Sequence, residues 1–147
     1  KAVCYKEAMS SDFITYQKQV VTNAKTLASE LASRGFRLVS GGTDTHLMLI
    51  DLTGKGMTGK KAQAVLEDVN IVINKNMIPF DKEKPFVTSG IRIGTPALTT
   101  RGMAETEMRV IAGLIDDAIS NPDCEATKNR IRAKVKDLCD AFPIYGG

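Results

Sequence analysis

Residues 85–102 read Pro-Phe-Val-Thr-Ser-Gly-Ile-Arg-Ile-Gly-Thr-Pro-Ala-Leu-Thr-Thr-Arg-Gly, and this stretch sets one arginine between isoleucines and two glycines. The pattern predicts a short strand over 90–94. Strand side chains alternate between faces, so Ile91 and Ile93 are predicted to be buried while Arg92 points the opposite way. A guanidinium on a short strand can bind a carboxylate through two parallel hydrogen bonds. Spacing alone leaves two interpretations open: a carboxylate clamp or an exposed edge-strand arginine.

The sequence that follows this strand predicts two helices. Gly94-Thr95-Pro96 is expected to end the strand, and Thr99 or Thr100 to cap the next helix. That helix is predicted over 103–120, before Pro122, and a last helix over 125–141. The apolar face of the first of these helices is expected to consist of Val110, Ile111, Leu114, Ile115 and Ala118.

The sequence before the arginine strand also alternates between helical and strand patterns. Apolar residues at three- and four-residue steps predict a long helix that ends near Ser33; they are Phe13, Tyr16, Val20, Ala24, Leu27 and Leu31. Strands at 36–40 and 46–52 are expected to form a hairpin, followed by a helix at 60–69, a strand at 71–74 and a loop over 75–87. This order predicts an α+β fold in which a small, mostly antiparallel sheet is covered by helices.

Length and composition are those of one ordinary globular domain over residues 1–147, since 43% of the residues are hydrophobic and 25% are charged. A net charge of +3 does not indicate a nucleic-acid partner, and no apolar run is long enough to predict a membrane span. Three cysteines without metal-ligand spacing are typical of reduced thiols, so we expect a cytoplasmic protein without a metal site. A chain that opens at Lys1 is expected to be a fragment.

Residues 54–61, Gly-Lys-Gly-Met-Thr-Gly-Lys-Lys, nearly match the phosphate-binding loop G-x-x-x-x-G-K-[ST]. Lys61 stands where the magnesium-binding hydroxyl belongs, and the preceding strand is predicted to pair antiparallel, unlike in phosphate-loop proteins. Nucleotide binding at this loop is therefore a secondary hypothesis. His46 has no second histidine with which to complete a metal site and is expected to be a structural residue, hydrogen-bonded near the turn. Asp116 and Asp117 are expected to lie on a solvated helix face.

Four segments together resemble the serine hydroxymethyltransferase family. They are Leu-Val-Ser-Gly-Gly-Thr-Asp-Thr-His-Leu at 38–47, Gly-Lys-Lys-Ala at 59–62, Asn-Lys-Asn at 74–76 and Thr-Ser-Gly-Ile-Arg-Ile-Gly-Thr-Pro-Ala at 88–97. The match runs in order from about Ala8 and resembles only the C-terminal third of the family enzyme, its small domain. The resemblance implies the C-terminal fold of fold-type I pyridoxal-phosphate-dependent transferases, without the large domain that supplies the Schiff-base lysine.

The resemblance implies a transferase of one-carbon metabolism that interconverts serine and glycine and passes the one-carbon unit to tetrahydrofolate. Pyridoxal phosphate would be the cofactor of the full-length enzyme, which is implied to be a homodimer or tetramer. No catalytic residue is expected within this chain, so the isolated chain is predicted to be inactive. An alternative is a stand-alone module that binds an amino acid or folate without chemistry.

The resemblance also implies roles for particular residues. Arg92 is similar to the arginine that binds the substrate carboxylate, and Asn76 to the asparagine that hydrogen-bonds the folate pteridine. Lys84-Pro85-Phe86 resembles the folate-contacting segment Ser-Pro-Phe, with Lys84 in place of the serine. We expect Arg92 to face solvent where the large domain would pack, and an uncovered apolar surface to favour self-association.

Overall fold

The structure is a computed structural model that describes residues 1–144. Its helices are α1 (Ala2–Ala8), α2 (Ser11–Ser33), α3 (Gly59–Asp68), α4 (Pro96–Thr100), α5 (Glu105–Ser120) and α6 (Glu125–Ala141). Its strands are β1 (Arg37–Leu38), β2 (Leu47–Asp51), β3 (Asn74–Asn76) and β4 (Gly90–Gly94), with short 3-10 turns at Val39–Gly41 and Thr53–Lys55. None of the helices within residues 1–144 combines the length and apolar composition that a membrane span needs.

The four strands form one sheet in the order β1-β2-β4-β3, and every neighbouring pair is antiparallel. The predicted pairing of the two strands on either side of the Gly-Gly turn is confirmed, because Leu38 of β1 lies opposite Ile50 of β2. The predicted strand at 90–94 is confirmed at both ends, and it lies in the interior of the sheet rather than at an edge.

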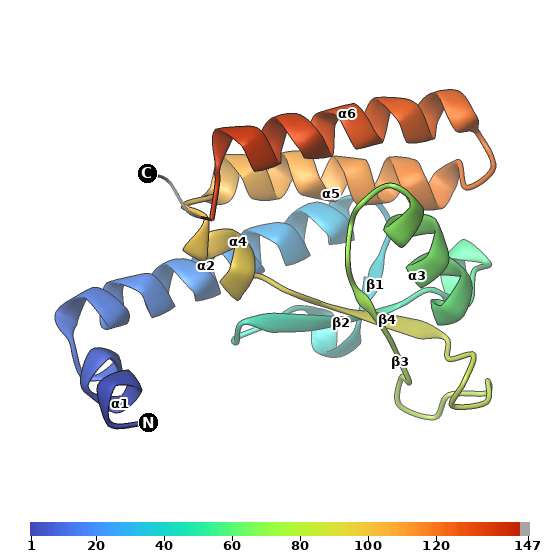
Figure 1. Cartoon of the computed structure of the whole chain (residues 1–147). Helices are drawn as coiled ribbons and strands as arrows, with labels where there is room; N and C mark the ends of the chain where they lie inside the picture. The colour runs from blue at the N-terminus through green and yellow to red at the C-terminus, as the bar shows by residue number, and fades with distance from the viewer. Residues whose placement is uncertain (145–147) are drawn as a thin grey trace.

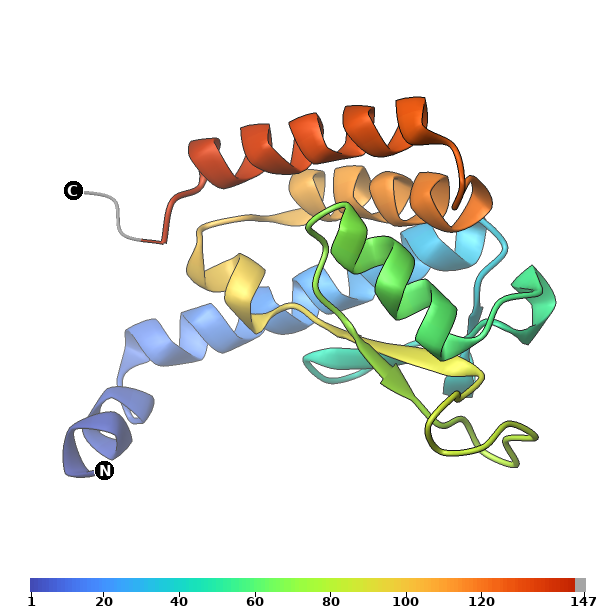
Figure 2. The same cartoon turned by 45° about the vertical axis from the view of Figure 1, so that its right-hand side comes forward.

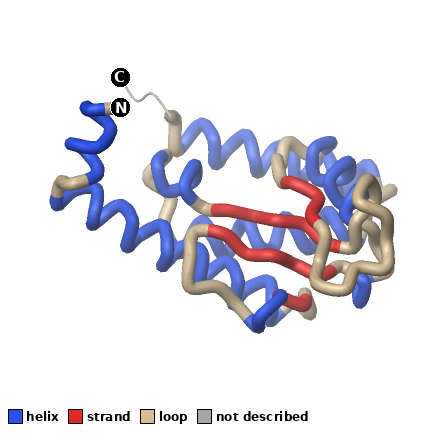
Figure 3. The backbone as a smooth tube through the Cα atoms, turned by 90° about the horizontal axis from the view of Figure 1, so that it is seen from below, coloured by secondary structure: helices blue, strands red, loops and turns tan. Residues whose placement is uncertain are grey.

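Helices cover only one face of this sheet (Figure 1). The view from below in Figure 3 shows the strands in front of the helices, so the second face is open except at one end, where the loop between β3 and β4 lies over it. Next to the covered face lie α2 and α3, then α5, with α6 outermost (Figure 2). The core forms where Met48, Ile50, Ile91 and Ile93 of the sheet meet the apolar sides of these helices, and all four are almost completely buried.

The long helix α2 follows the predicted pattern over most of its length. Ser10 begins it by accepting a hydrogen bond from the Phe13 N–H at 3.2 Å, and its buried side includes Val20, Ala24, Leu27 and Leu31. Phe13 and Tyr16 lie outside this core, because the first turns of α2 extend beyond the sheet (Figure 1).

The predicted start of the helix over 103–120 was wrong, whereas its end at Ser120 is confirmed. Residues 96–100 form the separate helix α4, and Gly102, with φ of 89°, turns the chain before α5 begins at Glu105. Neither Thr99 nor Thr100 caps α5, because both hydroxyls donate to carbonyls one turn earlier, those of Thr95 and Pro96 at the start of α4. The Ala104 N–H instead donates to the Glu107 carboxylate at 2.9 Å.

Two further sequence predictions need correction. Val110 is 42% exposed, and the buried face of α5 uses Met108 and Ala112 together with Leu114, Ile115 and Ala118. The strand predicted at 71–74 was wrong in its position. The chain pairs with β4 only over residues 74–76, because Ile73 packs into the core before the chain reaches β4.

Candidate functional site

The open face of the sheet collects polar side chains from two neighbouring strands. Arg92 lies opposite Leu49 of β2 and Asn74 of β3, and the next row contains Gly90 between Asp51 and Asn76. Because paired residues of adjacent strands share a face, Arg92, Asn74 and Asn76 project from the same side of the sheet. This is the candidate site, and the strand register brings two of the residues singled out in the sequence, Arg92 and Asn76, onto it.

Arg92 is exposed, while its neighbours Ile91 and Ile93 are buried on the other face. No hydrogen bond or ion pair occupies its guanidinium within the part of the chain that the structure describes. Gly90 and Gly94 lie two residues away on either side and carry no side chain that could crowd it. The arginine therefore presents a planar, unpaired donor set above a rigid strand, which fits recognition of a carboxylate.

The C-terminal end of β4 is anchored to α2 by buried polar groups. The Thr95 hydroxyl donates to the Val20 carbonyl at 2.9 Å, and the side-chain amide of Asn23 donates to Thr99 Oγ1 and to the Met103 carbonyl, both at 2.9 Å. Thr95 and Asn23 are completely buried. The sequence analysis missed Asn23, although a polar residue three positions after Val20 on an apolar helix stripe was a signal.

The loop that joins β3 to β4 is organised around Asp81. Its carboxylate accepts hydrogen bonds from the Ser89 hydroxyl at 2.6 Å and from the N–H groups of Ile78, Glu83 and Ser89 at 3.2, 2.9 and 2.9 Å. The Ser89 hydroxyl and these backbone donors hold the pKa of Asp81 well below its usual range, although partial desolvation opposes them. The sequence analysis also missed Asp81. Its signal was an aspartate in a loop, because an aspartate side chain commonly accepts a hydrogen bond from the backbone N–H two residues later and so forms a turn.

The residues expected to contact folate lie in or beside this loop. Asn76, at the end of β3, is half-buried, and its side-chain N–H donates to the Met77 carbonyl at 2.8 Å. Lys84, Pro85 and Phe86 are exposed, and Phe86 keeps 82% of its surface accessible. The Lys84 carbonyl accepts from the Val87 and Thr88 N–H groups, so its backbone forms a turn. No hydrogen bond within residues 1–144 joins this tripeptide to Arg92 or Asn76.

The glycine-rich loop at 54–61 does not form a phosphate site. The N–H groups of Gly59 and Lys60 at the start of α3 donate to the carbonyls of Thr88 and Val87, both at 2.9 Å, and the Lys61 N–H donates to Thr58 Oγ1 at 3.2 Å. The strand that precedes the loop is antiparallel to both of its neighbours. The donors that would hold phosphate are therefore occupied, and the nucleotide hypothesis is wrong.

The side chain of Lys55, in the same loop, makes tertiary contacts. Its ammonium donates to the Arg34 carbonyl at 2.9 Å and to Asp116 at 3.3 Å, and it lies 4.3 Å from the centre of the Phe36 ring. Asp116 is thus half-buried in an ion pair, so the prediction of a solvated face was wrong for this residue. Asp117 pairs with Arg130 at 3.0 Å but keeps 40% of its side chain accessible, as expected for a solvated face.

His46 contributes through its backbone and not through its ring. Its carbonyl accepts from the Thr95 N–H at 3.0 Å, while the exposed imidazole forms no hydrogen bond within the described part of the chain. The expectation of a hydrogen-bonded ring was therefore wrong. Among residues 1–144, no group of three or more histidine, cysteine, aspartate or glutamate side chains is arranged to hold a metal ion.

Comparisons with known proteins identify the family. The family model described as Serine hydroxymethyltransferase matches residues 1–115. The chain is similar to the serine hydroxymethyltransferase of Polaromonas sp. (strain JS666 / ATCC BAA-500), with 57% identity over 145 residues that cover 99% of the chain. It is similar to that of Myxococcus xanthus (strain DK1622), with 55% identity over the same share of the chain. The chain spans 35% of the length of these curated relatives. The resemblance is therefore confirmed, and the chain belongs to the serine hydroxymethyltransferase family.

Proposed function

We propose that this chain is the C-terminal small domain of a pyridoxal-phosphate-dependent enzyme that interconverts serine and glycine and transfers the one-carbon unit to tetrahydrofolate. Within that enzyme, Arg92 binds the carboxylate of the amino-acid substrate. The observation that carries this proposal is the unpaired guanidinium on the open sheet face, inside a segment matched by the family model. We also propose that the complete enzyme is a cytoplasmic homodimer or tetramer.

The guanidinium of Arg92 suits an amino-acid carboxylate better than a lysine ammonium at the same place would. A carboxylate is planar and accepts two parallel hydrogen bonds, which the guanidinium fork supplies and an ammonium does not. Because the guanidinium has no partner among residues 1–144, substrate binding requires no ion pair within that part of the chain to be broken first. Covering the open face with another part of the enzyme would exclude water and strengthen this pair.

Asn76 and the exposed tripeptide support a folate site beside the arginine. The side-chain oxygen of Asn76 and one of its two N–H groups remain available after the bond to Met77, and a pteridine edge offers the complementary donor and acceptor. The Phe86 ring is free to pack on an aromatic ligand. Because Lys84 replaces the family's serine, a contact there would use the Pro85 and Phe86 surfaces instead of a hydroxyl.

The described residues do not form a site for pyridoxal phosphate by themselves. The strand positions that share the open face with Arg92 include no lysine that could form a Schiff base, and Lys75 lies on the other side of β3, opposite Ile91. The backbone N–H groups at the start of α3, which could otherwise bind a phosphate, are occupied. We therefore propose that the cofactor is held by the part of the enzyme that the relatives have beyond this matched third.

The decisive experiment substitutes Arg92 in the complete enzyme that carries this sequence. Arg92→Lys keeps the charge but loses the fork, so the KM for serine should rise about tenfold or more, as expected for the loss of one charge-assisted hydrogen bond. Arg37→Lys is the matched control, because Arg37 lies on the same sheet but is already paired with Asp51. An unchanged affinity for serine in Arg92→Lys would overturn the proposal.

A stand-alone binding module remains the second candidate, since Arg92 and Asn76 are accessible without any other domain. Titration of the isolated chain with serine and with tetrahydrofolate by calorimetry separates the two. Borohydride reduction after incubation with pyridoxal phosphate adds a second readout. Diffuse, sub-stoichiometric lysine labelling supports the domain proposal, whereas one stoichiometrically labelled lysine would show a self-contained cofactor site.

A further inference from the structure

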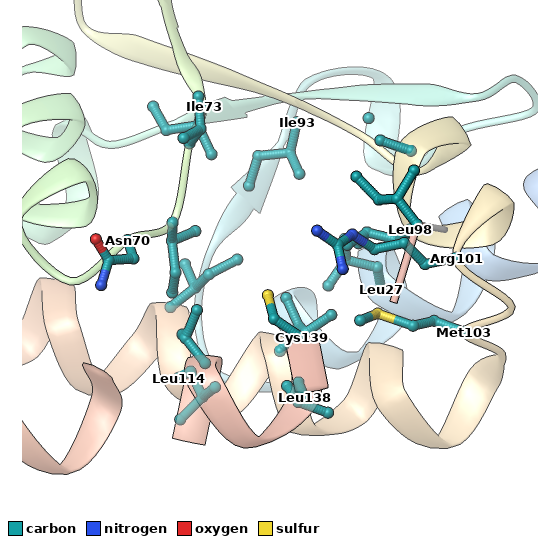
Figure 4. A pocket seen from close by; sticks show the side chains of 18 residues that line it. Leu27, Asn70, Ile73, Ile93, Leu98, Arg101, Met103, Leu114, Leu138 and Cys139 are labelled. Carbon is teal, nitrogen blue, oxygen red and sulfur yellow. The ribbon is translucent and has the colours of Figure 1, made fainter. Parts of the chain in front are cut away.

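A second feature of the molecule lies on the other side of the sheet from Arg92. It is a cavity of about 410 Å³ between the connector 70–73, helix α4 and the packed helices α5 and α6. Its wall is almost entirely aliphatic and includes Leu27, Ile73, Ile93, Leu98, Leu114 and Leu138 (Figure 4). Its volume lies in the range of small-molecule sites, which typically combine apolar walls with a few polar groups.

One cation reaches into this apolar space. The Arg101 guanidinium points into the cavity from the turn after α4 (Figure 4). Its Nη1 donates to the Phe142 carbonyl at 2.7 Å, and no carboxylate pairs with it within residues 1–144. A guanidinium has five N–H donors, so most of them have no partner among residues 1–144. A cation against apolar walls favours an anion that brings its own hydrocarbon surface.

We propose that this cavity binds a small amphipathic carboxylate, with its hydrocarbon body against the aliphatic wall and its carboxylate on Arg101. The two parts of the ligand match the two parts of the site: the wall excludes water from the chain, and the free edge of the guanidinium binds the acid group. Because Ile93 faces this cavity and Arg92 faces the opposite side of β4, the ligand does not occupy the proposed serine site.

Cys139 provides a reporter inside the cavity. Its sulfur points into the space (Figure 4), and the residue is half-buried, whereas Cys4 and Cys124 are exposed on other parts of the chain. A bound ligand should therefore slow alkylation of Cys139 and leave the alkylation of Cys4 and Cys124 unchanged. The three thiols within one molecule make this comparison internally controlled.

The test uses the whole 147-residue chain, with decanoate and decanol as the probes. Calorimetry should show saturable decanoate binding, with decanol weaker by about tenfold or more because it lacks the charge that Arg101 pairs with. Arg101→Met should reduce decanoate binding to the level of decanol, and Arg109→Met, at an exposed arginine of α5 outside the cavity, should leave it unchanged. Mass spectrometry should show that decanoate protects Cys139 alone.

A second variant covers the case in which Arg101→Met disturbs the contact to Phe142. Ala97 is exposed on α4 at the cavity wall, so Ala97→Trp should fill the mouth without altering the core, and should abolish decanoate binding while thermal unfolding stays the same. Equal binding of decanoate and decanol, or no protection of Cys139, would overturn the proposal. So would self-association that Ala97→Trp removes, because the occupant would then be a second copy of the chain.

Discussion

Ser89 donates both its hydroxyl and its backbone N–H to Asp81, at 2.6 and 2.9 Å, and thereby closes the loop between β3 and β4 onto itself. Residues 84–86 lie within the loop that this pair closes. The Asp81 carboxylate is therefore the charged acceptor that closes the loop, while the Lys84 carbonyl forms the turn before Val87 and Thr88.

Replacing that acceptor should loosen the loop. Asp81→Ala leaves the Ile78, Glu83 and Ser89 N–H groups without their partner, so hydrogen exchange across the loop should become severalfold faster. In the complete enzyme under the proposed function, the affinity for tetrahydrofolate should fall while the KM for serine stays near the original value. Lys82→Ala, at an exposed neighbour, is the control. A serine KM that rises as much as the folate constant would show general misfolding instead.

A second prediction concerns Gly59 at the start of α3. A Cβ at this position would collide with the Thr88 hydroxyl and the Gly90 carbonyl, and the carbonyl belongs to β4, which is paired with a strand on each side. Gly59→Ala should therefore lower the free energy of unfolding by about 1–3 kcal/mol, as overpacking does in a well-packed interior. Urea denaturation measures this directly.

Gly54, five residues earlier in the same loop, is the matched control for that substitution. Nothing lies within 4 Å of the Cβ that Gly54→Ala would add, so its unfolding free energy should change little. Equal stability of the two variants would mean that the close approach of α3 to β4 is not maintained in solution.

Self-association is the third prediction. Helix α1 and the start of α2 project from the rest of the molecule (Figure 1), and they expose Val3, Tyr5, Met9, Phe13 and Ile14. Such a patch favours burial against another surface. Sedimentation velocity of the isolated chain should show a concentration-dependent increase in mass, which Ile14→Lys reduces and Phe80→Lys, on the distant loop, does not. A monomer at all concentrations would contradict the prediction.

Local patterns were sufficient to predict several elements at their observed bounds. The end of α2 at Ser33, the strand at 90–94 and the last helix at 125–141 follow from apolar periodicity and from the glycine or proline beside each. The orientation of Arg92 followed from strand alternation alone. These features depend on residues that are near one another in sequence.

The remaining features depend on partners far along the chain. Asn23 binds the Met103 carbonyl 80 residues away, so neither position reveals the contact by itself. The interior place of β4 follows from the strand order β1-β2-β4-β3, and this order also decides that Arg92 stands beside Asn74 and Leu49. The occupied N–H groups of α3 likewise could not be seen in the glycine-rich motif, because their acceptors come from residues 87–88.

The last prediction concerns acid stability through Asp51, which is almost completely buried. Burial opposes ionisation of this carboxyl, but hydrogen bonds from the Thr53 hydroxyl at 2.6 Å and N–H at 2.8 Å, with the Arg37 pair, outweigh burial and lower its pKa below the ordinary value of 3.8. A lowered pKa in the folded state means that the stabilisation is fully present above pH 3.8 and is lost as the pH falls further, through the folded-state pKa.

Asp51→Ala should therefore cost about 1–3 kcal/mol of unfolding free energy at neutral pH, because the Thr53 donors lose their acceptor. Arg37→Ala should cost less, since that side chain is 69% exposed and Thr53 still holds the carboxylate. Urea denaturation from neutral pH down to about pH 3 should show wild-type stability converging on that of Asp51→Ala as the carboxyl protonates. Asp44→Asn, at a fully exposed position, should keep the wild-type slope. Parallel pH profiles for Asp51→Ala and the wild type would show that the Asp51 carboxyl does not control acid stability.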